Sequence, residues 1–318
     1  MNQIRTDLAI EVHEMLTETA TELSGVTVHK EQKHNARISR VKIETLRAQH
    51  QMGKPIGNYI TIEFPDVNIA EGEDYENLCR TMAEELSALL PLQKNNTVLV
   101  VGLGNQNITP DALGPSVVSK LMVTRHLLQY IPDQIDEGIR PVCAISPGVL
   151  GITGMETGEV IRGVTDKIHP DAVIVVDALA ARSMDRISTT IQLCDTGISP
   201  GAGVGNNRKE LNKSSLGVPV IAVGVPTVID AATIATDTLQ LAAQKENSGK
   251  LCRELAAMDR EEQYTILKEA LPESLNGFMV TPKDVDLFIE RVAKVVANGI
   301  NLSLHKNITF QDIAAYTS

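Results

Sequence analysis

Three uninterrupted runs of aliphatic residues constrain the fold of this chain more than any other feature. They are VLVV at 98–101, AVIVV at 172–176 and VPVIAV at 218–223. An unbroken run of Val, Leu and Ile is typical of a strand buried on both faces, as in a parallel sheet. Amphipathic segments with helical spacing separate the runs. This alternation predicts an α/β fold with a mostly parallel, twisted sheet flanked by helices.

Further elements follow from the periodicity of the apolar residues. Alternation of polar and apolar residues over 58–64 predicts an edge strand, and RPVCAISP at 140–147 predicts another strand. Helical spacing gives the remaining elements. Predicted helices cover residues 74–90, 114–129, 153–168 and 230–244, one or two charged helices are expected within 1–50, and a polar, helical, peripheral segment is expected over 245–271.

The segment 281–299 predicts a closing helix with recognisable ends. Thr281 can accept a hydrogen bond from the first free N–H groups, and Pro282 suits the first turn. Gly299 is placed where a helix commonly ends, because glycine adopts the left-handed conformation of a C-terminal cap.

Composition excludes several classes of protein. The net charge of −11 over 318 residues argues against a protein that binds a nucleic-acid backbone. No apolar run reaches the roughly 18–20 residues of a membrane span, and the N-terminus lacks a signal peptide, so we expect a cytoplasmic protein without membrane partners. The four cysteines form no CxxC pair, which predicts neither a zinc site nor a disulfide framework.

Two aspartates follow predicted strands, where open α/β sheets bind their ligands. Asp111 lies in the loop GLGNQNITPDALGP at 102–115, and Asp177 directly follows the run at 172–176. Each has a structural alternative, since Asp111 could cap the next helix and Asp177 could pair with Arg182. We find neither a serine nucleophile elbow nor an HExxH motif. The two aspartates are therefore the best catalytic pair, one as acid and one as base.

Two glycine-rich loops have other interpretations. The loop at 102–115 begins like a dinucleotide-binding loop, but Asn107 stands where the third glycine would be, so NAD binding is not predicted. The loop at 195–211 lacks the GK(S/T) ending of a phosphate-binding loop. It is either a loop that covers the substrate or a plain connection.

Several long motifs resemble the germination proteases of spore-forming Firmicutes. They include VGLGNQNITPDALGP, PGVLGITGMETGEVI, VDALAARSMDRISTTIQLCDTGISPGAGVGNNRKEL and GVPVIAVGVPTVIDAATIATDT, and the resemblance covers nearly the whole chain. It implies an endopeptidase that initiates degradation of small acid-soluble spore proteins in the forespore or spore core. It also implies an aspartic-type enzyme that uses Asp111 and Asp177 without metal or cofactor, and a homotetramer. The implied fold is similar to that of hydrogenase-maturation endopeptidases, with N-terminal helical and β additions.

The resemblance further implies a zymogen that removes its own N-terminal segment. Members of the family cut after an acidic residue in a stretch similar to TE(F/I)ASE. TDLAIE at 6–11 has this pattern and predicts a cut between Asp7 and Leu8. Residues 1–7 would then be a propeptide and 8–318 a single peptidase domain. Alternatively, Thr6 and Asp7 cap a first helix, which can also hold in the uncut form.

A site that prefers Glu or Asp before the cut needs positive or hydrogen-bonding groups. The expected substrate-binding residues are Arg208, Lys209, Gly203, Gly205 and Asn105. Arg125 and Arg182 are rival candidates for binding the acidic side chain. Two other functions remain open, a nickel-dependent processing peptidase and a non-catalytic binder of spore proteins.

Overall fold

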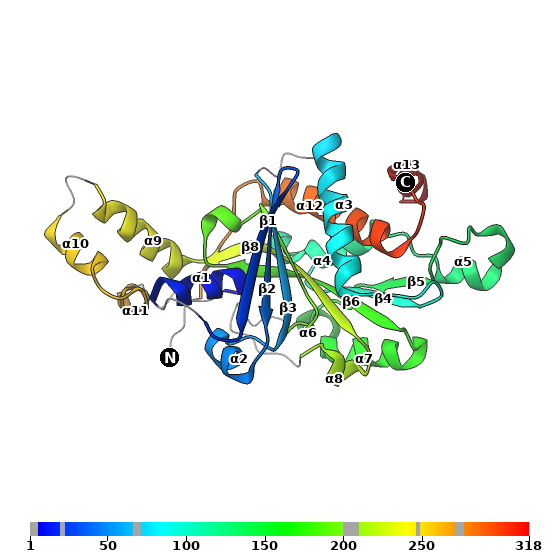
Figure 1. The fold of residues 1–318 in the computed structure, drawn as a ribbon, viewed down its shortest axis with the longest axis horizontal. Helices are drawn as coiled ribbons and strands as arrows, with labels where there is room; N and C mark the ends of the chain where they lie inside the picture. The colour runs from blue at the N-terminus through cyan, green and yellow to red at the C-terminus, as the bar shows by residue number, and fades with distance from the viewer. Residues whose placement is uncertain are drawn as a thin grey trace.

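A mixed sheet runs through the computed structural model, which describes residues 6–19, 23–65, 71–199, 210–245, 249–270 and 277–317. Within these residues nine strands lie in the order β1-β2-β3-β7-β8-β6-β4-β5, and β9 pairs with β8 (Figure 1). The pairs β4–β5, β4–β6 and β6–β8 are parallel, and the other pairs are antiparallel. Helices flank this sheet, as the alternation of elements predicts.

The aliphatic runs form the centre of the sheet. They become β4, β6 and β8, and every residue of 98–101 and 172–176 is buried. The strands are β1 (Val26–Lys33), β2 (Ala36–Ile43), β3 (Gly57–Glu63), β4 (Val98–Gly102), β5 (Val142–Ile145), β6 (Ala172–Ala181), β7 (Thr190–Cys194), β8 (Val220–Asp230) and β9 (Met279–Val280).

The helices connect these strands. They are α1 (Ala9–Thr19), α2 (Leu46–Met52), α3 (Glu73–Leu89), α4 (Leu113–Val118), α5 (Arg125–Tyr130), α6 (Leu150–Thr153), α7 (Thr157–Ile168), α8 (Lys213–Leu216), α9 (Ala231–Ala243), α10 (Lys250–Ala256), α11 (Arg260–Ala270), α12 (Val285–Leu304) and α13 (Phe310–Thr317). Three-residue 3-10 helices are η1 (Thr109–Asp111), η2 (Pro132–Gln134) and η3 (Met184–Arg186).

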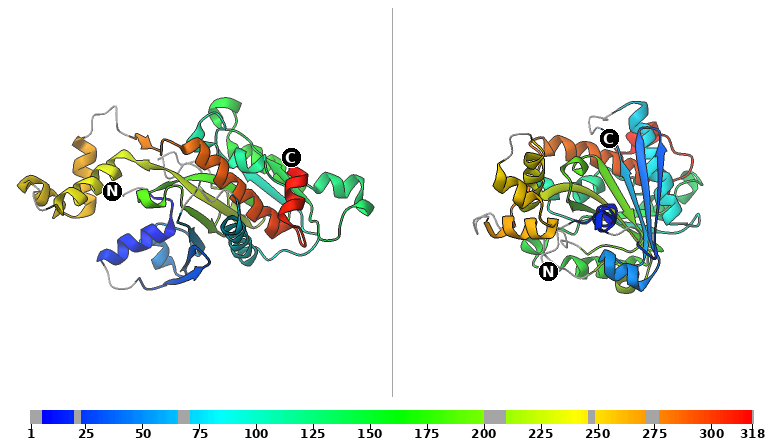
Figure 2. Two further views of the ribbon diagram at one scale, coloured as in Figure 1. Left: turned by 90° about the horizontal axis from the view of Figure 1, so that it is seen from above. Right: turned by 60° about the vertical axis from the view of Figure 1, so that its left-hand side comes forward.

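Alternate residues of β6 face two different sets of helices. Ile174 and Val176 pack in a core with α3, α4 and α12. Val173 and Val175 pack with α7 and α8, and Leu179 packs with α1 and α2. The predicted peripheral segment forms α10 and α11, which project with α9 from one end of the molecule (Figures 1 and 2). No described helix is long and apolar enough to cross a membrane.

Two predictions about the N-terminal quarter need correction. Two described helices, α1 and α2, lie in the region expected to hold one or two, but residues 26–43 between them form the hairpin β1–β2. Ile38, Val41 and Ile43 of β2 are buried in the cores that pack on the sheet, while β1 is largely exposed. β3 is an interior strand and not an edge strand, since it pairs with both β2 and β7.

Two predicted helices also differ from the structure. The helix expected over 114–129 is broken into α4 and α5, because Met122 N donates to the Asn301 side chain and Thr124 N donates to Val142 O. α12 begins at Val285, since the Thr281 hydroxyl donates to Thr227 O instead of capping the helix. The same helix continues through Gly299 to Leu304.

Candidate active site

Asp177 lies where β6 loses one of its two neighbours. β4 pairs with β6 only as far as Val176, so Asp177 is the first residue beyond the carboxyl end of β4. β6 itself continues to Ala181 along β8, which places Asp177 within the strand rather than at its end. Asp177 is 7% exposed, and its carboxylate accepts a hydrogen bond of 2.9 Å from Ala178 N. It is therefore a buried acid beside the end of a parallel strand, the expected place for a ligand.

Asp111 is held by the loop that follows β4. Its carboxylate accepts a hydrogen bond of 2.9 Å from Asn105 N, and its carbonyl accepts one of 3.0 Å from the same group. Gly104 permits this close approach, because its φ is +111° and a Cβ there would lie 2.0 Å from Asp111 O. The N-cap position of α4 is Ala112, without a side-chain cap. The prediction that Asp111 caps this helix is therefore wrong.

Thr227 ties the Asp111 loop to the sheet. It is the extra residue of a bulge in β8, where the pairing with β6 shifts after Leu179. The Thr227 hydroxyl donates to Pro110 O at 2.8 Å, and Thr281 in turn donates to Thr227 O at 2.9 Å. A bulge re-aims a side chain, and here it fixes the residue next to Asp111.

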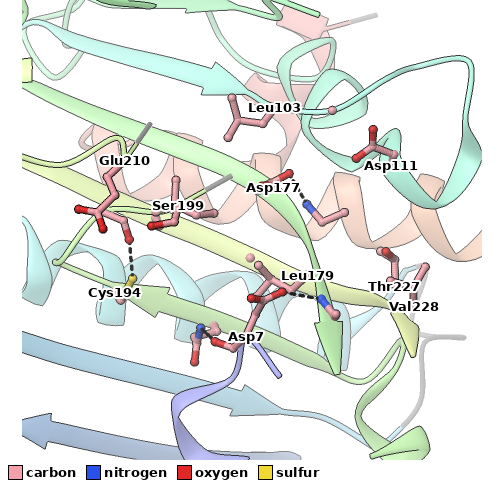
Figure 3. Close-up of a pocket in the computed structure, with 18 of the residues that line it drawn as sticks. Asp7, Leu103, Asp111, Asp177, Leu179, Cys194, Ser199, Glu210, Thr227 and Val228 are labelled. Atoms are coloured by element: carbon pink, nitrogen blue, oxygen red, sulfur yellow. Dashed lines mark hydrogen bonds between the residues drawn. The ribbon is translucent and has the colours of Figure 1, made fainter. Parts of the chain in front are cut away.

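Both aspartates line one cavity of about 610 Å³, together with Asp7 (Figure 3). Residues of β6, β7 and β8 form its floor, and the loop after β4 forms part of its wall. The predicted catalytic pair and the predicted processing site are thus brought together, although 104 residues separate Asp7 from Asp111 in the sequence.

The N-terminal segment enters this cavity and binds through its main chain. Asp7 N donates to Ala180 O at 3.0 Å, and Ala180 N donates to the Asp7 carboxylate at 2.8 Å. The Gln192 side chain donates to Asp7 O at 3.1 Å and accepts from Ala9 N at 2.7 Å. These contacts bind the segment to β6 and β7 in the manner of an extended peptide on a sheet.

Asp7 is a partly buried acid and does not cap α1. Burial raises the pKa of its carboxyl group, while the charge of Lys54 and the hydrogen bond from Ala180 act in the opposite direction. Its carboxylate is directed to β6, whereas Thr6 accepts from Leu8 N and donates to the Glu11 carboxylate. Lys54 also lines the cavity, so a positive charge accompanies the acidic side chain.

Glu11 occupies a second site for a carboxylate. It is 1% exposed and accepts hydrogen bonds from Arg182 N at 2.8 Å and Ser183 N at 3.0 Å. Arg186 lies 3.6 Å from Glu11 and binds Glu14 through two nitrogens. The residues between the two acids are completely buried, namely Leu8, Ala9 and Ile10.

The structure describes only one of the five predicted substrate-binding residues, Asn105. Arg208, Lys209, Gly203 and Gly205 lie outside the described residues. Asn105 is not among the described residues that line the cavity, and its side chain accepts from Asn107 N. Arg182 contacts Glu11 through its main chain. Substrate binding by the five predicted residues stays a prediction.

Four polar residues at the site were not predicted. Arg186 and Thr227 lie within the long motifs quoted above, but no local pattern marks them for a role, and Lys54 lies outside those motifs. Gln192 stands between Ile191 and Leu193 in the strand TIQLC, and an amide side chain among apolar neighbours is the signal that could have drawn attention to it.

The prediction that the chain has no serine-elbow pattern is wrong for the sequence itself. GISPG at 197–201 has the GxSxG spacing, and Ser199 lines the cavity. A nucleophile elbow requires a tight turn from strand to helix, but Ile198 forms an antiparallel bridge with Leu211. No histidine occurs among the described residues that line the cavity. The geometry therefore does not favour a serine nucleophile.

Cys194 also lines the cavity, as a buried thiol. Burial raises its pKa, and the thiol donates to Gly197 O at 3.3 Å. A thiol with a raised pKa is a poor nucleophile at neutral pH. Among the described residues, no group of three or more His, Cys, Asp or Glu side chains is arranged to hold a metal ion.

Comparisons with known proteins agree with the motifs. The sequence profile of a family described as Germination protease matches residues 5–256 and 242–317. A germination protease of Clostridium acetobutylicum is 49% identical over 327 residues, covering 100% of both chains. One from Bacillus cereus is 42% identical over 356 residues, covering 99% of this chain and 97% of the relative. A crystal structure of the NiFe hydrogenase maturation protease HycI from Thermococcus kodakarensis matches 68% of this chain and 98% of its own, with 15% identity and a TM-score of 0.34.

Proposed function

The chain belongs to the germination protease family, and we propose that it is an aspartic-type endopeptidase that initiates the degradation of small acid-soluble spore proteins. One observation carries this proposal. A segment with the acid–apolar–Ala–x–Glu pattern expected of a substrate, Asp7 to Glu11, is bound at the cavity that Asp111 and Asp177 line.

Hydrolysis by the two aspartates needs no other nucleophile. One carboxylate accepts a proton from water, whose oxygen attacks the carbonyl carbon of the acidic residue before the cut. The other keeps a proton and transfers it to the leaving nitrogen. Two carboxyl groups in one cavity do not both ionise easily, so one keeps its proton and acts as the acid while the other acts as the base.

Recognition of the substrate follows the contacts of the N-terminal segment. An acidic residue before the cut would bind Ala180 N near the charge of Lys54. The small residue at the position of Ala9 is completely buried, so a larger side chain has no room there. Arg208 and Lys209, with Gly203 and Gly205 in the same loop and Asn105 in the loop after β4, are further proposed contacts for substrate.

The same contacts support a zymogen that cuts itself between Asp7 and Leu8. The segment already lies at the cavity, so self-cleavage needs no second molecule. Ala180, which binds Asp7, is three residues along β6 from Asp177. Hydrolysis therefore requires a movement that brings the Asp7–Leu8 peptide within reach of Asp177. The need for this movement explains why self-cleavage would depend on a trigger.

Intact mass of the full-length protein, followed over time at mildly acidic pH, tests this function. We expect the wild type to lose residues 1–7 and the Asp111→Asn and Asp177→Asn variants to remain uncut. Near-normal cleavage by a folded Asp177→Asn variant would contradict the aspartic mechanism. A parallel sample with a chelator separates this mechanism from a metal-dependent one, and binding of a spore-protein peptide without turnover would identify a non-catalytic binder.

We also propose that the protein acts as a homotetramer in the spore core, as its family resemblance implies. Light scattering on the purified protein should then give four times the mass of the chain. A monomeric mass at micromolar concentration would contradict the proposed assembly but not the proposed chemistry.

A further inference from the structure

Both the donor and the acceptor of the Gln192 side-chain amide bind the N-terminal segment. Gln192 lies on β7, is 7% exposed, and donates to Asp7 O while it accepts from Ala9 N. Asp7 O is the carbonyl oxygen of the Asp7–Leu8 peptide bond, and Ala9 N belongs to the next peptide bond. A buried amide normally satisfies its donor and acceptor within its own fold. Here both hydrogen bonds go to main-chain groups at or next to the proposed cut.

Gln192 and Asp177 lie in one row across three neighbouring strands. Gly224 of β8 pairs with Gln192 on one side and with Asp177 on the other. Residues paired in this way project to the same face of a sheet. Strands lie about 4.8 Å apart, so the Cα atoms of Gln192 and Asp177 are separated by roughly 10 Å.

Gly224 makes room for the side chain of Leu179 between them. A Cβ at Gly224 would lie 2.3 Å from Leu179 Cδ1, so Leu179 packs directly over the glycine. The peptide group that Gln192 holds therefore reaches Asp177 only after a shift of the segment and of Leu179, which is the movement that self-cleavage requires.

We propose that Gln192 is a catalytic residue that binds the scissile carbonyl and stabilises the negative charge that develops on its oxygen. This inference rests on the proposed function. When water attacks, the C–O bond forms, the water proton goes to the basic aspartate, and the electron pair of the carbonyl moves onto the oxygen that Nε2 contacts. When the intermediate collapses, that pair re-forms the carbonyl. The C–N bond then breaks, and the nitrogen takes a proton from the acidic aspartate. An amide donor aimed at such an oxygen accelerates acyl transfer by about 100-fold or more.

The acceptor half of the amide has a different task. Gln192 Oε1 binds Ala9 N, two residues after the acidic residue, and this contact is the same before and during the reaction. It therefore contributes to binding and orientation rather than to stabilisation of charge. A substitution that removes only the donor should separate these two contributions.

Gln192→Glu and Gln192→Met in the full-length chain provide the test. Intact mass gives the rate of self-cleavage, in which the segment is already bound, so the rate does not depend on affinity for a separate substrate. Both variants should be about 100-fold slower than the wild type near neutral pH. In Gln192→Glu the deficit relative to the wild type should shrink as the pH falls, because a protonated carboxyl group can donate again. Gln192→Met has no such group and should stay slow.

Gln129→Glu is the matched control, because it makes the same change in charge at an exposed position of α5. Thermal unfolding verifies that each variant is folded. Rates within twofold of the wild type in both variants would overturn the role of Gln192. So would an equal deficit at every pH in both, which indicates a structural role. If the wild type itself does not cleave, the proposed function fails, and this inference fails with it for that separate reason.

Discussion

At the scale of single residues, the site is defined by how it accommodates buried carboxylates. Glu11 is almost fully buried and receives two N–H groups, one on each oxygen, from Arg182 and Ser183. Hydrogen bonds to a charged group contribute about 1.5–3 kcal/mol each. A site with two such donors and a nearby arginine therefore selects Glu over Gln, which has only one acceptor oxygen.

We accordingly predict that the last Glu of a TEFASE-like peptide determines how well it is cut. Replacing it with Gln should lower kcat/KM about 10- to 100-fold, because one charge-assisted bond is lost. Arg186→Met should reduce this discrimination, whereas Arg182→Met should preserve it, since Arg182 acts through its main chain. Peptide kinetics with the self-processed protein measure both effects. Equal kcat/KM for the Glu and Gln peptides would show that Glu11 is bound for structural reasons only.

His305 gives a pH-dependent contribution to stability far from the cavity. It is buried, accepts a hydrogen bond from Arg140 N, and burial lowers its pKa from 6.5 to about 4. As the pH falls, the unfolded chain takes up a proton first. The stability is therefore fully present above pH 6.5 and is lost as the pH falls toward 4. A pKa lowered from 6.5 to about 4 corresponds to roughly 3 kcal/mol of stability.

We predict that the free energy of unfolding of the His305→Gln variant depends less steeply on pH than that of the wild type. Glutamine can still accept from Arg140 N but does not titrate. Urea unfolding of both proteins between neutral pH and pH 4 gives the comparison, and the difference isolates His305 from the carboxylates that titrate in the same range. Parallel curves for the two proteins would contradict the assignment.

At the scale of elements, secondary structure is predicted best for strands that are buried along their whole length. β4 and β6 are buried on both faces, so their aliphatic runs are visible without any tertiary information. The hairpin β1–β2 was missed because β1 is mostly exposed, and its charged residues resemble those of a surface helix. The break between α4 and α5 depends on Asn301, more than 170 residues away, and no local signal reports it.

Gly299 shows how a local rule can be overridden by packing. The residue lies inside α12, where a Cβ would come within 2.6 Å of Met82 Sδ on α3. Its function is close approach of two helices and not termination. Gly299→Ala should therefore lower the free energy of unfolding by about 1–2 kcal/mol, since overpacking outweighs the gain in helix propensity.

Gly163 provides the matched control within α7. Nothing lies within 4 Å of a Cβ at that position, so Gly163→Ala should raise the free energy of unfolding by about 0.5–1 kcal/mol. Urea unfolding of the two variants tests the pair. A stabilising effect at Gly299 would mean that Met82 moves aside at little cost.

At the scale of the whole molecule, the site is assembled from the N-terminal segment and the middle of the sequence. The segment at 6–11 is bound by groups on β6, on β7 and just before η3, about 170 to 185 residues further on. The place of the two aspartates at the cavity could be predicted, because Asp111 lies in the loop after β4 and Asp177 directly follows an aliphatic run. The row of Gln192, Gly224 and Asp177 could not, because it depends on the register of three strands.

This arrangement leads to a last prediction, that the segment from Leu8 to Glu11 leaves the site after self-cleavage. A cut after Asp7 turns Leu8 N into an ammonium group, which is charged at neutral pH because its pKa is about 8. Leu8 is completely buried and its N–H is bonded to Thr6, which leaves with the propeptide. A buried, unpaired charge is unfavourable, so the new terminus should move into solvent and draw Glu11 from its site. Hydrogen exchange at Arg182 and Ser183 should then become about 10- to 100-fold faster after processing, while α12 stays protected. Unchanged protection at these two amides would mean that the cut segment remains bound and that substrates must displace it.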